Sequence, residues 1–212
     1  NPTEYVYNKE DITLIAPKRE GQVFIGWDFT SKGGVVQSDA HSPAHTVIEK
    51  GSYGNLDFTA RWATLTASGY DGEYDGQSHA ASASINGAEG FAIFYSTDNG
   101  QQWSTTAPSI TDVGTVNVKV KAEKAGYKTL TAETTLKVTP VGVTVTAENK
   151  TKVFGAADPT LTAKTTGTYG TDTVTYTLSR AKGENVGIYT ITPAGKELQG
   201  NYKVTYKTGT LT

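Results

Sequence analysis

The sequence of 212 residues contains no cysteine and no methionine. Without cysteine the chain cannot form disulfides, use a thiol nucleophile or bind a metal through thiolates. Without methionine residue 1 is not a translation start, so we expect a piece of a larger or processed protein. Apolar runs approaching about 18 residues are also missing, so we expect no membrane insertion by this segment.

Charge of either sign is scarce as well. Charged residues make up 19% of the chain, and the formal net charge is -2. No Lys/Arg cluster offers a basic face, so nucleic acid is not expected as a partner. Hydrophobic residues, at 36%, are frequent enough for a folded chain rather than a disordered one.

The residues that are abundant favour strands and turns. Thr, Val and Tyr suit a pleated, half-buried surface, and the 23 glycines supply turns. Apolar residues alternate with polar ones in four segments: 56–62, 116–122, 141–147 and 202–206. No long segment has the helical period of about 3.6 residues. The sequence therefore predicts a mainly all-β protein.

The strand pattern divides the chain into three small modules, 1–62, 63–140 and 141–212. The first closes on a strand ending at Trp62, and Pro140, which has no N–H to donate, interrupts the ladder between the second and third.

The second and third modules end in the same order of features. Asp112-Val113-Gly114 and Asn185-Val186-Gly187 each precede a strand, and each strand is followed by a turn and a final strand that begins near Tyr127 or Tyr202. We interpret this as one sandwich plan used twice.

The first module carries an ordered set of glycine and aromatic positions, namely Asp11-Ile12-Thr13-Leu14, Pro17, Arg19-Glu20-Gly21, Phe24, Gly26-Trp27, Gly51-Ser52-Tyr53-Gly54-Asn55 and Ala60-Arg61-Trp62. This set resembles the Listeria–Bacteroides repeat of the internalin B-repeat type, which implies a small β-grasp fold. Gln22 stands where that family has an aromatic residue. The family's opening strand would precede Asn1, so we expect a module without its first strand and with an exposed edge.

The other two modules resemble repeats of bacterial surface proteins. The second resembles bacterial Ig-like repeats through Tyr74-Asp75-Gly76, His79, Tyr95-Ser96-Thr97-Asp98, Trp103 and Asp112-Val113-Gly114. The third resembles the MBG family through Lys152-Val153-Phe154-Gly155, Asp158-Pro159, Leu178-Ser179-Arg180, Gly183-Glu184-Asn185-Val186-Gly187, Tyr189-Thr190-Ile191 and Asn201-Tyr202. Phe154 stands where the MBG pattern usually has Tyr. We expect two Ig-like, β-sandwich-type domains.

Together these resemblances imply a non-catalytic structural or adhesive segment of a secreted, cell-surface bacterial protein. Such a segment acts as a stalk or makes weak contacts with host or cell-surface proteins or glycans. We expect a monomer without a cofactor. The alternative is a carbohydrate-binding accessory segment of a large secreted glycosidase.

One motif could indicate an enzyme. Ser96-Thr97-Asp98-Asn99-Gly100-Gln101-Gln102-Trp103 fits the Asp-box pattern of sialidase-type propellers. A β-hairpin explains every residue of it: Asp98 accepts local backbone N–H groups, Gly100 takes a positive φ and Trp103 packs on the returning strand. A module of this size is also too small for a propeller.

The polar and aromatic candidates for other sites have structural explanations too. Asp71, Glu73 and Asp75 could begin a calcium loop, but three carboxylates are too few and both Asp-Gly pairs are typical of turns. His41 and His45 could share a metal, yet Ser42-Pro43 disfavours a helix between them, and His79 is the one other histidine.

Trp27 and Trp62 could stack on a sugar or pack in a core, and their alternating strand positions favour the core. Exposed tyrosines such as Tyr53 or Tyr169 could contribute to binding. The sequence thus identifies no catalytic, cofactor-binding or metal-binding residue, and it leaves the ligand-binding residues unidentified.

Overall fold

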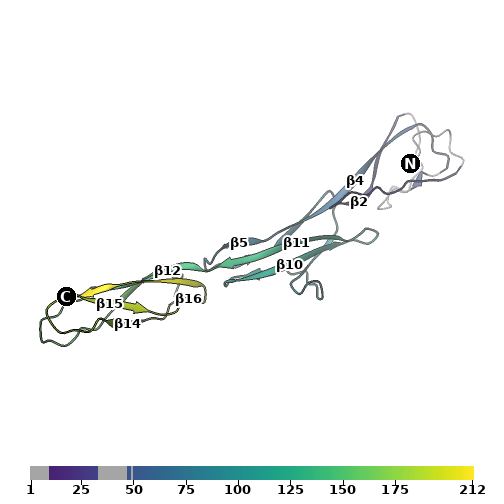
Figure 1. Cartoon of the computed structure of the whole chain (residues 1–212). Helices are drawn as coiled ribbons and strands as arrows, with labels where there is room; N and C mark the ends of the chain where they lie inside the picture. Colours follow the sequence, from purple (N-terminus) through teal and green to yellow (C-terminus); the bar gives the residue numbers. More distant parts are fainter. Residues whose placement is uncertain (1–9, 33–46, 49) are drawn as a thin grey trace. The chain divides into compact units, whose positions relative to one another are not determined.

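The computed structural model describes residues 10–32, 47–48 and 50–212, and every regular element within them is a β-strand (Figure 1). The prediction of an all-β protein is therefore confirmed. Among these described residues no helix is long and apolar enough to cross a membrane. The chain divides into two compact units. Unit 1 comprises Asn1–Gly69, Ala81–Pro108 and Asn117–Thr134, and unit 2 comprises Tyr70–Ala80, Ser109–Val116 and Thr135–Thr212.

Unit 1 contains a long strand shared by two neighbours. Its sheet has the order β2 (Val23–Lys32), β4 (Asn55–Ser68), β7 (Ser82–Asn86), and β1 (Ile12–Thr13) pairs separately with β3 (Val47–Ile48); all of these pairs are antiparallel. Residues 55–63 of β4 pair with β2, and residues 64–68 pair with β7. The strand thus passes without a break through the predicted boundary after Trp62. That boundary stays a prediction, as does the β-grasp fold, since residues 1–9 and 33–46 lie outside the described residues.

A second group of strands begins in unit 1. The strand β8 (Ala92–Ser96) pairs antiparallel with β10 (Gly114–Glu123), whose neighbour is β11 (Leu130–Thr139). Both β10 and β11 contribute residues to each unit. Val118, Val120 and Ala122 are buried, so the predicted alternation of β10 is confirmed. Tyr127, predicted to enter the final strand, instead lies in the turn before β11 and packs against Phe91.

Unit 2 contains two larger sheets and two short pairs. One sheet has the order β13 (Ala163–Thr166), β12 (Val141–Ala147), β17 (Tyr202–Lys207), β16 (Leu198–Gln199), and the other β14 (Thr177–Arg180), β15 (Tyr189–Ala194), β18 (Gly209–Leu211). The pairs β12–β17 and β5–β11 are parallel, with β5 spanning Tyr70–Glu73, and β6 (His79–Ala80) pairs antiparallel with β9 (Ser109–Ile110).

The core of unit 2 forms because alternate residues of its strands point inward. The buried side chains of its main cluster are Tyr74, Val138, Val143, Val145, Val174, Tyr202 and Val204. A second cluster contains Ala147, Ile191 and Leu211. The alternation predicted for 141–147 and 202–206 is confirmed. The main cluster also joins residues from both sides of Pro140, so the division into modules at this residue stays a prediction.

The chain changes sheets near its last residues. The sequence predicts that Tyr202 opens the final strand, and this is wrong. Tyr202 opens β17, and a further strand, β18, follows and pairs with β15. Gly209 opens β18 where the backbone passes close to β12: a Cβ built on it would lie 2.5 Å from the carbonyl oxygen of Ala147. The absence of a side chain at this position therefore permits the crossing.

Candidate functional site

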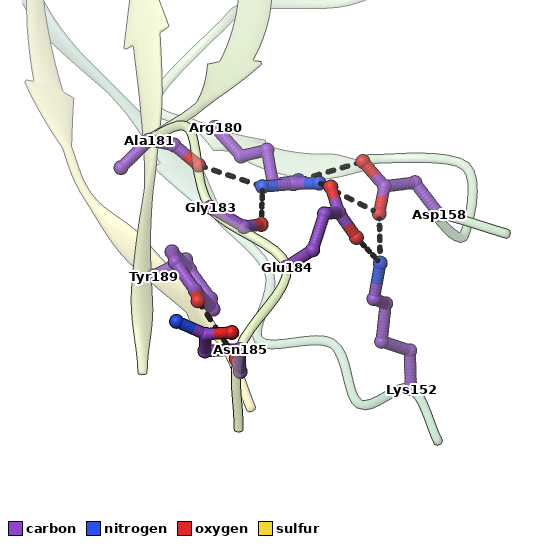
Figure 2. Close-up of polar contacts among 8 residues, drawn as sticks. All are labelled: Lys152, Asp158, Arg180, Ala181, Gly183, Glu184, Asn185 and Tyr189. Atoms are coloured by element: carbon purple, nitrogen blue, oxygen red, sulfur yellow. Dashed lines mark hydrogen bonds and ion pairs between the residues drawn. The ribbon is translucent and has the colours of Figure 1, made fainter. Parts of the chain in front are cut away.

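Four charged side chains from three segments meet at one end of the β14–β15 hairpin. Lys152 and Asp158 come from the loop after β12, Arg180 ends β14, and Glu184 lies in the loop between β14 and β15 (Figure 2). We name these four residues the ion cluster. Ion pairs thereby connect two loops and a strand end, with partners up to 32 positions apart in the sequence.

Each charge of the ion cluster has opposite charges as neighbours. Lys152 Nζ lies 2.8 Å from both Asp158 Oδ1 and Glu184 Oε2. Arg180 Nε lies 2.6 Å from Asp158 Oδ2, and Arg180 Nη2 also contacts Glu184. Arg180 Nη1 donates to the carbonyl oxygens of Ala181, at 2.8 Å, and Gly183, at 2.7 Å. The fork of the guanidinium thus fastens the β14–β15 loop as well as the two carboxylates.

These contacts favour the charged form of every member. The Arg180 guanidinium and then the Lys152 ammonium lower the pKa of Asp158 to about 2. Lys152 and Arg180 lower the pKa of Glu184, and both carboxylates raise the pKa of Lys152. A general base or nucleophile needs a pKa near the working pH. All four groups are shifted away from it, so the ion cluster suits a structural tie better than proton transfer.

The two loops that the ion cluster connects, after β12 and between β14 and β15, also carry exposed apolar side chains. Val153 is 79% exposed, Phe154 70%, Val186 89% and Ile188 73%. We name these four residues the apolar patch. Isolated exposed apolar residues are common on proteins, but Phe154, Val186 and Ile188 line one cavity, and a group of large exposed apolar residues marks a surface that binds another molecule.

A cavity of about 240 Å³ lies within this surface. Phe154, Val186, Ile188 and Leu211 line its apolar side, and Lys152 and Glu184 lie at its charged side. Tyr189 forms part of the wall: its hydroxyl donates to the carbonyl oxygen of Asn185 at 2.7 Å, as Figure 2 shows. An apolar centre with a charged rim is the usual composition of a protein-binding surface.

The Asp-box segment forms a hairpin, as its turn chemistry predicts. Asp98 Oδ1 accepts the backbone N–H groups of Gln101 and Gln102, at 3.0 and 2.9 Å, and the Ser96 hydroxyl at 2.7 Å. These bonds lower the pKa of Asp98, the one from Gln102 most. Gly100 has a φ of 93°. Tyr95 and Ser104 exchange two backbone hydrogen bonds that close the hairpin.

The carboxylates considered for calcium are occupied by local partners. Asp71 pairs with Lys137 at 3.4 Å, and Asp75 accepts from the N–H of Gln77 at 2.8 Å and bonds the His79 ring at 3.0 Å. Gly72 lies inside β5 rather than in a turn, so the turn predicted at Asp71-Gly72 is wrong; β5 pairs with β11 there. In the part of the chain that the structure describes, no three His, Asp or Glu side chains form a metal-binding group. His41 and His45 lie outside that part.

The tryptophans of the first sheet pack against other rings. Phe24 lies 5.2 Å from Trp27 and 6.0 Å from Trp62 between ring centroids, and Trp27 lies 6.3 Å from Phe58. This favours packing over sugar stacking. Tyr53 and Tyr169 are partly exposed, and Tyr169 contacts the ring of Tyr74.

Comparison with known families bears on the same region. Residues 143–212 match the family model of the MBG domain (YGX type). The MBG resemblance of the third module is therefore confirmed. MBG domains are a non-catalytic repeat type found in bacterial surface proteins. We name the matched residues, 143–212, the MBG segment, and the match is consistent with this segment being a module of a surface protein. No curated protein and no solved structure matches the chain. The resemblances of residues 1–62 and 63–140 stay predictions.

The sequence pointed to these residues without identifying them as a site. All four members of the ion cluster, together with Val153, Phe154 and Val186, belong to the MBG pattern. Nothing in their spacing indicated that the four charges meet. Ile188 lies outside the residues that carry the MBG resemblance. The sequence does contain a signal: Val186 and Ile188 are two large apolar residues on either side of Gly187.

Proposed function

We propose that the chain is a non-catalytic structural segment of a secreted, cell-surface bacterial protein, and that it acts as a stalk that resists tension. The observation that carries this proposal is the parallel pairing of strands that stand at opposite ends of a segment. In the MBG segment β12 is the first strand, and its residues 141–146 pair in parallel with residues 202–207 of β17. The strand β5 pairs in parallel with β11 in the same way.

Parallel pairing determines how a pulling force meets the hydrogen bonds. When one strand is pulled by its amino end and its parallel partner by its carboxyl end, the two slide past each other, and all hydrogen bonds of the ladder carry the load together. When both strands are pulled from the same end, the bonds break one after another. A chain pulled through its two termini loads β12 and β17 in the first way once β18 has separated from β15. The force at which a protein unfolds depends on its unfolding rate, so it measures how strongly the ladder resists being sheared.

The proposal is tested by pulling the full chain from chosen positions. The chain has no cysteine, so introduced cysteines define the attachment points. In Gly142→Cys/Lys207→Cys the tethers load opposite ends of the β12–β17 ladder, and in Gly142→Cys/Lys203→Cys they load the same end, because Gly142 pairs with Lys203. A Cβ on Gly142 meets no atom within 4 Å. We expect a higher unfolding force for the first pair. Equal forces would remove the argument for a tension-resisting stalk.

A second function is favoured by a cavity of about 270 Å³ beside the Asp-box hairpin. Asp98, Gln102, Trp103 and Ser104 are among its lining residues, and an aromatic ring with several hydrogen-bonding groups is a suitable site for a sugar. Lys121 covers one face of the Trp103 ring, because its Nζ lies 4.7 Å from the ring centroid.

This second function is tested on a glycan array with folding checked by circular dichroism. Carbohydrate binding supports it when Trp103→Ala abolishes binding and the exposed aromatic control Tyr53→Ala does not. Absence of binding to any glycan by the unmodified chain excludes it.

A further inference from the structure

Two loops of unit 2 occupy equivalent places in the repeated plan. They are Asp112-Val113-Gly114, whose Gly114 is the first residue of β10, and Asn185-Val186-Gly187, which Ile188 separates from β15. The same number of residues separates Val113 from Thr139 as separates Val186 from Thr212. The two loops thus match in spacing as well as in type.

Backbone hydrogen bonds show the same equivalence independently. The N–H of Tyr74 donates to the carbonyl oxygen of Thr139 at 2.8 Å, and the N–H of Lys152 donates to that of Thr212 at 2.9 Å. Both bonds belong to parallel pairs. Thr212 therefore holds the place that Thr139 holds, and Thr139 is the residue from which the chain continues through Pro140 into the MBG segment.

The first of these loops is covered by the segment that follows it. The N–H of Val113 donates to Asn201 Oδ1 at 2.8 Å, and Asn201 Nδ2 donates to Asp112 Oδ1 at 2.9 Å. The Val113 side chain packs on the main core cluster, which contains Tyr74 and Tyr202. Asn201 of the MBG segment thus docks on the Asp112-Val113 loop through two hydrogen bonds, and Val113 packs on the core cluster to which Tyr202 belongs.

The second loop presents the corresponding surface uncovered. Val186 stands where Val113 stands and is 89% exposed, and Val153 and Phe154, which follow Lys152, the residue equivalent to Tyr74, are 79% and 70% exposed. Asn185 replaces Asp112, and a side-chain amide can still accept from another asparagine. The charges beside this surface are paired within the ion cluster, so they do not oppose an incoming apolar face.

We propose that the apolar patch is the docking surface for a further β module of the same kind, joined after Thr212 as the MBG segment is joined after Thr139. That module covers Val186 and Phe154 with an asparagine–tyrosine turn equivalent to Asn201-Tyr202. This interface does not depend on the tension-resisting role, because it concerns how consecutive modules pack and not how each one unfolds.

The test adds a second copy of residues 140–212 directly after Thr212 of the full chain. Hydrogen exchange followed by mass spectrometry then measures protection of residues 184–188 in the first copy. We expect exchange in this segment to become slower by about tenfold or more than in the chain without the added copy. Replacing the asparagine of the added copy that corresponds to Asn201, as Asn201→Ala in that copy alone, is expected to reverse most of this protection.

A matched pair of substitutions in the first copy separates docking from general stability. Val186→Asp places a charge in the apolar patch, and Leu198→Asp places one at an equally apolar position that is 61% exposed elsewhere in the MBG segment. We expect Val186→Asp to abolish the protection and to lower the melting temperature of the added copy, and Leu198→Asp to change neither. Both should leave the melting temperature of the 212-residue chain unchanged.

Two results would overturn the proposal. One is unchanged hydrogen exchange of residues 184–188 although the added copy is folded. The dispersion of its amide signals in NMR spectra shows whether it is folded. The other is reversible dimerisation of the 212-residue chain in sedimentation experiments that Val186→Asp abolishes, since the patch would then bind a second copy of the chain rather than a following module.

Discussion

At the scale of single residues, Asp172 supports two buried tyrosines of the main core. Its Oδ2 accepts the hydroxyl of Tyr202 at 2.7 Å and that of Tyr74 at 3.2 Å, and the N–H of Tyr169 donates to the hydroxyl of Tyr202 at 3.0 Å. Burial, followed by the hydrogen bond to Asp172, raises the pKa of Tyr202 to about 12. The Tyr202 hydroxyl therefore makes hydrogen bonds with two partners from the loop between β13 and β14.

Removing that hydroxyl tests the network. Tyr202→Phe is expected to lower the free energy of unfolding by about 1–3 kcal/mol, because one hydrogen bond is lost and the N–H of Tyr169 loses its acceptor. Urea denaturation of the variant and of the exposed control Tyr53→Phe measures this loss. A Tyr202→Phe variant as stable as the control would mean that the hydroxyl contributes nothing net.

The sequence predicted one half of this arrangement. Alternation placed Tyr202, Val204 and Tyr206 on one face of a strand, and Tyr202 and Val204 are indeed buried. Asp172 could not be anticipated, because it lies in a loop and meets Tyr202 only after the sheets have formed. The ion cluster is similar: charge spacing did not predict that Lys152 and Arg180 share two carboxylates, and only the family pattern singled these residues out.

At the scale of elements, the passage from β17 to β18 leaves no room for a side chain at Gly209. Gly209 lies against the backbone of β12, with the carbonyl oxygen of Ala147 2.5 Å and that of Glu148 3.1 Å from where a Cβ would stand. The three atoms nearest to such a Cβ all belong to the backbone, so no flexible side chain can move aside to make room for it.

Gly209→Ala is therefore expected to destabilise the protein by about 1–3 kcal/mol through overpacking. Gly142→Ala is the matched control: it lies in β12, and an added Cβ meets nothing within 4 Å. Thermal denaturation followed by circular dichroism should show a lower melting temperature for Gly209→Ala and little change for Gly142→Ala. Equal melting temperatures would show that β12 and β18 separate at low cost.

The change of sheet at Gly209 also shows where sequence reasoning stops. A period of two tells which residues of a strand face inward, but it does not tell which strand becomes the neighbour. The single final strand predicted from Tyr202 onward is two strands in different sheets for this reason. The bonding partners of β4, which change from β2 to β7 along one strand, are hidden from the sequence in the same way.

At the scale of the whole molecule, ionisable groups define a range of pH in which the fold is most stable. The pKa of Asp158 is lowered from 3.8 to about 2. Its contribution to stability is therefore complete above about pH 4 and is lost as the pH falls toward 2. The pKa of Tyr202 is raised from 10.0 to about 12, so its contribution is complete below about pH 10 and is lost as the pH rises toward 12.

Melting temperatures measured from pH 2 to pH 12 should accordingly decrease at both ends. Asp158→Asn is expected to flatten the acid side and to leave the alkaline side unchanged, while Tyr202→Phe is expected to do the reverse. An acid side that keeps its slope in Asp158→Asn would show that other carboxylates with lowered pKa values, such as Asp98 or Glu148, dominate the acid unfolding.

The parallel ladder between β12 and β17 also constrains the order of events during synthesis and export. Within the matched residues 143–212 the partner of β12 is made late, since only β18 follows β17 there. Contacts between residues so distant along the chain form slowly, because a long loop must close first. A nascent chain that has completed β12 but not β17 lacks a central strand of this sheet. We therefore expect this segment to leave the ribosome unfolded, and to fold only after export where the protein is exported.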